Sequence, residues 1–469
     1  PYQSNALAWH LARLLSVAMG AVTVWATWQL ARILLHDEWL ALGAAALVAF
    51  LPEFLFISSV LNNDNLVVMF TALAILQTIR VLDKEPALRD YLLLGALLGL
   101  AALSKLSGFT VWLFTFLILA WKLWSAKSKR AVVANGALAF AVAVLVFAPY
   151  ALYNLVNRGD PLAWSLLLQV TPIRQAPPTL GDWWFDLRGL YSSFWGRYGG
   201  ALHLELPNWL YLGFSILALI ALGGWSLYAR AAWLRQLDRR IVRVFIFFAL
   251  FWTFLLLAHV RWVLTVLGAD QARQLFPGLP LLSIFLTVSF ARVFLPRLRA
   301  AIYVWSACFL AASLFLVFIL WSTYQTPTYT SAAALPSLGA SAPADFGKTI
   351  RLLDYRVEPT QARPGDMVTF TAYWQSLKPT DENNWLLLQL FSENEAIVNK
   401  DGVPSAGRLT TDLWQPNSIY VSHHTFQIPP DAESGKYKLT LGLHPFGTYD
   451  WLKVKGGDIF PLGTIEVTH

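Results

Sequence analysis

The apolar run 39-WLALGAAALVAFLPEFLFISSV-60 meets a polar island, 61-LNNDN-65, and a second apolar run, 66-LVVMFTALAILQTI-79, follows at once. Each run is about long enough to cross a bilayer core of ~30 Å as a helix. A lone charge in lipid costs several kcal/mol, so the island must lie at a membrane surface or in a wet cavity. Two interpretations are open: a solvated turn between two spans, or one wall of a site outside the cytoplasm.

The composition indicates a helical membrane protein. Of the 469 residues, 57% are hydrophobic and 13% are charged, with a mean hydropathy of +0.51; soluble domains carry about 25% charged residues. A transmembrane barrel would show short alternating segments instead of long apolar runs. The net charge of +7 forms no basic stripe with interleaved aromatic residues, so no nucleic-acid partner is expected. The single cysteine, Cys308, excludes an internal disulfide and a cysteine metal cluster.

The apolar segments predict about ten spans. Gly95 and Gly99 form a G-x-x-x-G pattern that is typical of close helix packing, and Pro52 should bend the second span. The segments are 11–35, 39–60, 65–82, 90–104, 107–124, 131–153, 207–229, 241–259, 274–295 and 300–321.

Basic residues predict the orientation, because cytoplasmic loops carry an excess of Lys and Arg. With ten spans, five loops on one side contain Arg32; Arg80, Lys84 and Arg89; Lys122, Lys127, Lys129 and Arg130; Arg230, Arg235, Arg239, Arg240 and Arg243; and Arg292, Arg297 and Arg299. The other side then receives the polar island, the turn at Lys105, the long loop 154–206, the turn 260–273 and everything after Trp321. An outside N-terminus without a leader predicts an earlier span before Pro1.

The pattern changes after the membrane segments, which we assign to a transmembrane domain over 1–325. Residues 326–345 form a linker of small residues and proline. Segments such as MVTFTAYWQSL and KYKLTLGLH then alternate apolar and polar residues, which predicts an extracytoplasmic β-sandwich of about seven strands over 346–469. Its Trp374, Trp414 and Trp451 are typical of packing residues, although stacking on sugar rings is the alternative.

Several lone cations lie at the predicted outer junctions. Lys105 is either a lysine snorkelling from a helix end or a phosphate ligand. Arg261 and Arg273 flank a turn that contains Asp270, and a helix starting after Arg273 would direct its positive end toward an anion. In the long loop, GDWWFDLRGLYSSFWGRYGG is typical of a segment on the membrane surface, and Arg197 is its candidate for binding a phosphate. We expect most other ionisable residues of this loop to be solvated, namely Asp182, Asp186, Arg188, His203 and Glu205.

Cations beside lipid suit a lipid-linked phosphate, because they stabilise its negative charge when it leaves. A carboxylate nearby (Asp64, Asp270 or Glu53) could accept a proton from an attacking hydroxyl. The paired His423 and His424 alternate across a strand and are not at metal-ligand spacing, so no metal site is predicted. The need for a divalent cation stays open.

Four segments in order resemble bacterial GT-C membrane glycosyltransferases: RLLSVAMGAVTVWATWQLAR, FLPEFLFISSVLNNDNL, LLLGALLGLAALSKLSG and RQLFPGLPLLSIFL. The closest group is the glycosyltransferase family 39-like proteins, relatives of protein O-mannosyltransferases and of lipid A aminoarabinose transferase. The similarity covers most of 10–295. It implies a plasma-membrane enzyme that takes a sugar from a polyprenyl phosphate on the outer leaflet. The sugar passes, with inversion, to an unknown protein, lipid or glycan acceptor.

The resemblance also implies roles for individual residues. Lys105 and Arg273 match basic residues that face the donor phosphate, and Arg13 matches an arginine that opens a span near the pocket. Asp64 matches the polar motif of the second outer loop. The catalytic carboxylate of the family lies in the first outer loop, which would precede Pro1. We therefore expect either that this sequence starts after its base or that Asp64 serves as the base, and we favour the former.

Two other function classes stay open. A transporter or flippase of lipid-linked sugars should have two repeated halves with broken helices near mid-membrane, whereas the polar groups here cluster at the outer surface. A membrane-anchored binding protein acting through its β-domain would keep its function when Lys105 and Arg273 are changed. The glycosyltransferase is the favoured class.

Overall fold

The computed structural model describes residues 5–83, 85–169, 171–198, 204–233, 238–295, 297–324, 328–329, 335–339, 343–392, 395–405, 409–448 and 450–468. The chain divides into two compact units, Pro1–Leu316 and Val317–His469. Among the expected functional or loop residues, Lys84, His203 and Arg235 lie outside the described residues, as does half of the linker.

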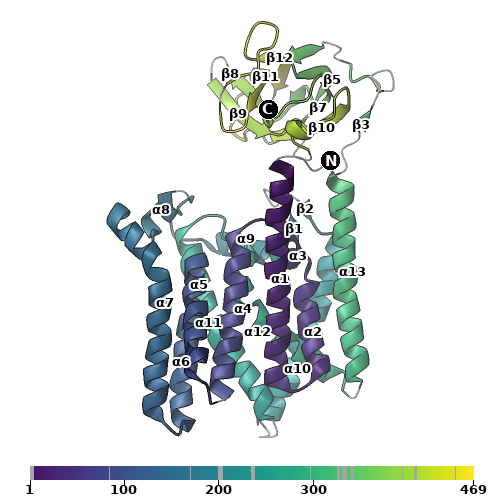
Figure 1. Cartoon of the computed structure of the whole chain (residues 1–469). Coiled ribbons are helices and arrows are strands. Elements are labelled where there is room, and N and C mark those ends of the chain that lie inside the picture. The colour runs from purple at the N-terminus through teal and green to yellow at the C-terminus, as the bar shows by residue number, and fades with distance from the viewer. Residues whose placement is uncertain are drawn as a thin grey trace. The chain divides into compact units, whose positions relative to one another are not determined.

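The first unit is a bundle of helices that run up and down in alternation (Figure 1). Each of the ten predicted segments is helical. The helices are α1 (Asn5–Leu35), α2 (Glu38–Ala49), α3 (Pro52–Ser58), α4 (Asn63–Asp83), α5 (Leu88–Ser104), α6 (Phe109–Ser125), α7 (Lys129–Arg158), α10 (Asn208–Trp233), α11 (Arg239–Thr265), α12 (Leu279–Val293) and α13 (Leu298–Tyr324). Short 3₁₀ helices, η1 (Leu106–Gly108) and η2 (Ala272–Gly278), precede α6 and α12.

Eight helices in the described ranges are long and apolar enough to cross a membrane, and α2 with α3 makes a ninth if the bent pair is one span. The remaining predicted span is α5, whose 17 residues place it at the short end of what can cross a bilayer. The predicted bend is present, because α2 and α3 meet at 62° and Pro52 opens α3. Proline lacks the N–H that would continue the helix and has the φ that starts a new one.

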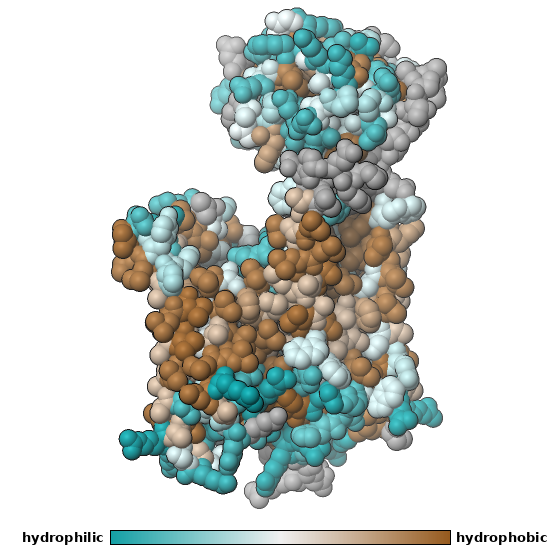
Figure 2. Space-filling model, in the orientation of Figure 1, coloured by the Kyte–Doolittle hydropathy of each residue, from teal (hydrophilic) through white to brown (hydrophobic). Residues whose placement is uncertain are grey.

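The ends of the bundle differ in polarity. On the face in view, Figure 2 shows a hydrophobic band across the helices and a hydrophilic lower end. At that end lie the ion pairs Arg32–Glu38, Lys127–Glu85 and Arg243–Asp83. The basic loops that we predict to be cytoplasmic therefore lie together, away from the polar island.

The long loop 154–206 lies at the opposite end and contains α8 (Trp164–Gln169), α9 (Leu180–Trp195), β1 (Arg197–Tyr198) and β2 (Leu204–Glu205). Helix α9 starts with a capping box, in which Thr179 and Asp182 bond reciprocally. Its large apolar side chains Leu180, Trp184, Phe185 and Leu187 are exposed. An amphipathic helix of this kind suits the membrane surface that the sequence predicted for this segment.

The second unit is a sandwich of two five-stranded sheets, in the orders β3-β10-β7-β5-β4 and β6-β12-β11-β8-β9. Phe370 and Trp374 from the first sheet pack with Leu388 and Leu441 from the second in one hydrophobic core. The strands are β3 (Thr328–Tyr329), β4 (Ala344–Phe346), β5 (Ile350–Glu358), β6 (Gln361–Ala362), β7 (Met367–Ser376), β8 (Asn384–Ser392), β9 (Glu395–Gly402), β10 (Ile419–Gln427), β11 (Gly435–Pro445) and β12 (Phe460–Val467).

Seven of these strands have eight or more residues, in agreement with the predicted number. The predicted linker 326–345 needs a correction, because it contains β3 and the first two residues of β4, and these strands pair with β10 and β5. Trp374 and Trp414 are buried in the core, so packing is the correct interpretation for them.

Glycines allow α5 and α7 to approach closely. A Cβ atom at Gly95 would lie 2.3 Å from the carbonyl oxygen of Ala139, and one at Gly99 would lie 2.6 Å from Cβ of Val146. These contacts are the tight packing that the G-x-x-x-G pattern predicted.

We expect Gly95→Ala to lower the free energy of unfolding by about 1–3 kcal/mol, the usual cost of overpacking. The measurement is thermal unfolding in detergent. Gly213→Ala in α10 is the matched control, because no atom lies within 4 Å of its added Cβ. Equal stability of the two variants would show that α5 and α7 are not held at this distance.

Candidate functional site

Three elements bring Asp64, Lys105 and Arg273 together. Asp64 lies in the first turn of α4, Lys105 follows the last residue of α5, and Arg273 belongs to η2. Nζ of Lys105 lies 2.5 Å from Oδ1 of Asp64, and Nε of Arg273 lies 3.7 Å from Oδ2. The carboxylate side chain is only 5% exposed, whereas Lys105 and Arg273 are 34% and 38% exposed. The two cations therefore share one buried counter-ion and face outward.

The amides of the polar island hold Asp64 in place. Oδ1 of Asn62 accepts the backbone N–H of Asn65 at 3.0 Å, which caps the first turn of α4. Nδ2 of Asn65 donates to the carbonyl oxygens of Ile57 at 3.0 Å and Val60 at 2.9 Å, where α3 ends. The island is thus a fixed turn that joins two helices, and its carboxylate lines the charged cluster.

Lys105 is held by a tight turn between α5 and α6. Its backbone is extended, its N–H donates to Ala101, and its carbonyl oxygen accepts the N–H of Gly108 at 2.8 Å. A Cβ atom at Gly108 would lie 2.2 Å from the carbonyl oxygen of Ala101, so the turn requires glycine there. This geometry directs the lysine side chain toward α4.

A second charged cluster surrounds Arg197 in β1. Its Nη1 lies 3.1 Å from Oδ2 of Asp270, and its Nε lies 3.1 Å from Oε1 of Glu205. Its backbone N–H donates to Oε2 of Glu53 at 2.9 Å. Glu53 is 2% exposed and links α3 to the long loop.

The segment from Asp270 to Arg273 connects the two clusters, because Asp270 pairs with Arg197 and Arg273 pairs with Asp64. Oγ of Ser193 donates to the carbonyl oxygen of Asp270 at 2.8 Å and accepts the N–H of Ala272 at 2.9 Å. Gly189 of α9 leaves room for Asp270, whose Cβ lies 2.5 Å from where a glycine Cβ would stand. Helix α9 therefore fixes the segment that presents Arg273.

A buried ion pair stabilises the long loop. Nη2 of Arg174 lies 3.1 Å from Oδ2 of Asp186, and both side chains are nearly inaccessible. Nε of Arg174 also donates to the carbonyl oxygen of Val263 at 3.0 Å. Burial raises the pKa of Asp186, and Arg174 acts against this rise. The hydroxyl of Thr179 donates to Asp182 and lowers the pKa of that carboxyl.

These observations correct the expectation that Asp186 is solvated. Its partner is Arg174, which was not among the predicted site residues. The only feature of the sequence that could have indicated it is an arginine between prolines in 171-TPIRQAPP-178. Arg188 is exposed, as expected.

Two expected residues lie apart from the clusters. Arg13 is exposed on α1 and, within the described ranges, forms no hydrogen bond or ion pair. The guanidinium of Arg261 lies 5.3 Å above the ring of Trp164, so it is held by an aromatic residue.

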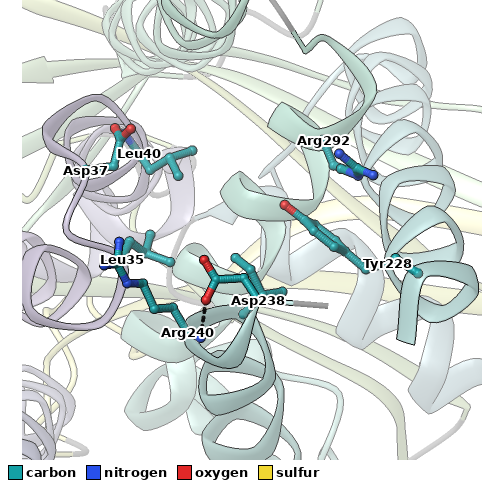
Figure 3. Close-up of a pocket in the computed structure, with 9 residues that line it drawn as sticks. Leu35, Asp37, Leu40, Tyr228, Asp238, Arg240 and Arg292 are labelled. Carbon is teal, nitrogen blue, oxygen red and sulfur yellow. Dashed lines mark hydrogen bonds between the residues drawn. The ribbon is translucent and has the colours of Figure 1, made fainter. Parts of the chain in front are cut away.

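A cavity of about 310 Å³ lies at the other end of the bundle. Figure 3 shows Tyr228 and Arg292 on one side of it and Asp37 and Leu40 on the other, with Asp238 accepting the N–H of Arg240. A second cavity of about 300 Å³ is lined by apolar residues of α6 and α7. Neither contains Asp64, Lys105 or Arg273, so a hollow around these charges stays a prediction.

Fold and charges together define a multi-pass membrane protein with a cationic cluster at one end of its helices and a separate β-sandwich. Residues 8–153 match the model of the dolichyl-phosphate-mannose-protein mannosyltransferase family. The matched segment runs from α1 into α7 and includes Arg13, Asp64 and Lys105, whereas Arg197 and Arg273 follow it. Comparison with curated proteins finds no match. The resemblance to GT-C glycosyltransferases is confirmed over this segment, and it supports a glycosyltransferase with a polyprenyl-phosphate-linked sugar as donor.

We expect Arg174→Met to destabilise the protein by about 3–5 kcal/mol at neutral pH, because it leaves Asp186 charged and buried. Without the arginine, the pKa of Asp186 in the folded state rises further above its value in the unfolded chain. The folded state then favours the protonated carboxyl, so the stability deficit grows as the pH rises from the pKa of the unfolded chain to the raised pKa of the folded state, and it shrinks in acid.

Thermal unfolding of this variant and the parent protein at about pH 4.5 and about pH 7.5 measures the effect. The gap in melting temperature should be wider at the higher pH. Arg188→Met controls for the loss of a positive charge in the same helical loop. A gap that does not depend on pH would contradict the assigned pair.

Proposed function

We propose that this protein transfers a sugar from a polyprenyl-phosphate donor to an acceptor hydroxyl on the extracytoplasmic face of the membrane, with inversion at the anomeric carbon. One observation carries the proposal: Lys105 and Arg273, from separate elements, converge on Asp64 at the end of the bundle opposite the basic loops. The family match over residues 8–153 supports the donor class.

The two cations are arranged to bind a phosphate. Both are more than a third exposed. Arg273 approaches Asp64 only through Nε, and in the described part of the chain its guanidinium makes no hydrogen bond. Its fork can therefore pair with phosphate oxygens in a bidentate manner. Asp64 keeps the cations close when no donor is bound, so little reorganisation is needed on binding.

The proposed reaction is a single displacement. The acceptor oxygen attacks the anomeric carbon, and the bond from that carbon to the phosphate oxygen breaks. The polyprenyl phosphate leaves with the bonding electrons, and Lys105 and Arg273 stabilise its growing negative charge. A carboxylate takes the acceptor proton, and Asp64 is the candidate that already lies in the cluster.

Arg197 supports this site indirectly. Its guanidinium is shared by Asp270 and Glu205, so it is less available to a phosphate than Arg273. It orients the segment 270–273 that presents Arg273. Arg13, which is exposed on α1, has no role in this proposal.

We assign the β-sandwich to the same side of the membrane as the charged cluster. Helix α13 (Leu298–Tyr324) starts after the basic loop with Arg292 and Arg297 and runs toward this end of the bundle; on the way, Oγ of Ser313 donates to the carbonyl oxygen of Phe50, between α2 and α3, at 2.7 Å. Phe309 of α13 stacks on Trp195, the last residue of α9. The chain then continues into the second unit on the extracytoplasmic side.

Replacing both cations tests the proposal. We expect the double variant Lys105→Ala/Arg273→Ala to lose at least about 100-fold in sugar transfer, because charge stabilisation of a leaving group contributes on this scale. The assay uses the protein in lipid vesicles with a radiolabelled polyprenyl-phosphate sugar. Arg261→Ala, an arginine at the same end that is held by an aromatic ring, should retain activity. Transfer that survives the double change would remove the assigned site.

Asp64→Asn separates the two roles of this carboxylate. If Asp64 mainly positions the cations, the amide should raise KM for the donor several-fold and leave the acidic limb of the pH profile in place. If Asp64 is the base, which must be deprotonated to act, kcat falls by about 10²–10⁴-fold and the acidic limb disappears. Unchanged KM, kcat and pH profile would exclude both roles.

A further inference from the structure

The β-sandwich has an outer face that combines aromatic rings with polar groups. In β8, residues alternate between the core and this face, so Leu386 and Leu388 are buried in the core while Trp385 and Gln389 face outward. β8 pairs with β11 on one side and with β9 on the other. Trp385 lies opposite His444 of β11, and Leu387 lies opposite Asp401 of β9. Three neighbouring strands therefore contribute to one surface.

Aromatic side chains cover this face. Trp385 and Phe446 have ring centroids 4.7 Å apart with an interplanar angle of 34°, and Phe446 is 61% exposed. Trp451 packs on Gly442, where a Cβ atom would lie 2.5 Å from its ring, and it contacts His444 edge-on at 5.1 Å. A side chain at position 442 would prevent Trp451 from lying against the sheet.

Hydrogen-bonding groups border the rings. Oδ1 of Asp401 lies 3.7 Å from Nε2 of His444, and the aspartate side chain is 53% exposed. Nε2 of Gln389 donates to Oδ1 of Asn399 at 2.8 Å. Nε1 of Trp385 is buried without a partner in the described part of the chain, although a buried indole N–H normally finds one.

This combination is poorly explained by packing alone. A soluble sandwich needs a polar outer face, and an exposed phenylalanine beside a tryptophan adds nothing to its core. A lipid-binding patch would be mainly apolar with basic residues, whereas a carboxylate and two amides lie here. The pattern fits a ligand that has both an apolar face and several hydroxyl groups.

From these observations, we propose that the face formed by β8, β9 and β11 binds a carbohydrate. The C–H groups of a pyranose ring would pack on Phe446 and Trp451, while Asp401, Asn399 and Gln389 bond its hydroxyls. A partly exposed carboxylate and neighbouring amides supply the acceptors and donors that neutral sugars require. This binding is separate from the transfer reaction and from Lys105 and Arg273.

Binding can be tested on the full chain in lipid nanodiscs. The probes are arrayed oligosaccharides of mannose, glucose, galactose and N-acetylglucosamine at up to about 1 mM, which covers weak sugar affinities. We expect the parent protein to bind a subset of these glycans, and empty nanodiscs to bind none. Phe446→Ala and Asp401→Asn should each weaken that binding by about tenfold or more.

Control variants test whether a loss of glycan binding is specific to this face. Met367→Ala removes a similarly exposed apolar side chain elsewhere in the sandwich, and Asp431→Asn removes an exposed carboxylate; both should bind as the parent does. Lys105→Ala should leave glycan binding unchanged, which keeps this result distinct from any loss of transfer. Absence of binding to every probe, or equal binding by Phe446→Ala and Met367→Ala, would overturn the proposal. Self-association of the parent protein that Phe446→Ala abolishes would instead make this face a contact between copies of the chain.

Discussion

A single buried carboxylate balances two cations at the edge of an otherwise apolar bundle. Asp64 is almost inaccessible, and both Lys105 and Arg273 turn toward it from separate elements. Without this anion, two like charges close to lipid would repel each other, and one of them would have to move into water. These charges thereby tie the ends of α4 and α5 to the 3₁₀ helix η2, in addition to the apolar core that the three elements share. An incoming anion would find this arrangement already formed.

Much of this architecture follows from the sequence, because long apolar runs leave few choices in a membrane. Each predicted span is helical, Pro52 bends the second one, and Gly95 marks a close helix contact. The convergence of Asp64 and Lys105 was also predictable, since α4 and α5 form a helical hairpin that brings the start of α4 and the end of α5 to the same end of the bundle. Arg273 could be added only because the basic loops fix the direction of every helix.

The paired residues of the long loop were harder to predict. Arg174 pairs with Asp186 within the loop, 12 residues away, but it also bonds the carbonyl oxygen of Val263, 89 residues away. Arg197 pairs with Asp270, 73 residues away. No local pattern distinguishes such a pair from two solvated charges, because burial depends on how the loop packs on α11 and η2. Strand β9 was not recognised as an alternating segment: it is an edge strand, and half of its eight residues are polar or charged.

The short helix α5 has a consequence for the lipid around it. Its 17 residues rise about 25 Å, less than the ~30 Å of a typical hydrocarbon core. Leu92, Leu93 and Leu103 are exposed along it, so it meets lipid directly. The bilayer must become thinner beside this helix, or the lysine at its end must stretch toward the headgroups. Both adjustments shorten the path between Lys105 and the phosphate layer of the leaflet at this end of the bundle, so a lipid-borne anion could reach the protein sideways without leaving its leaflet.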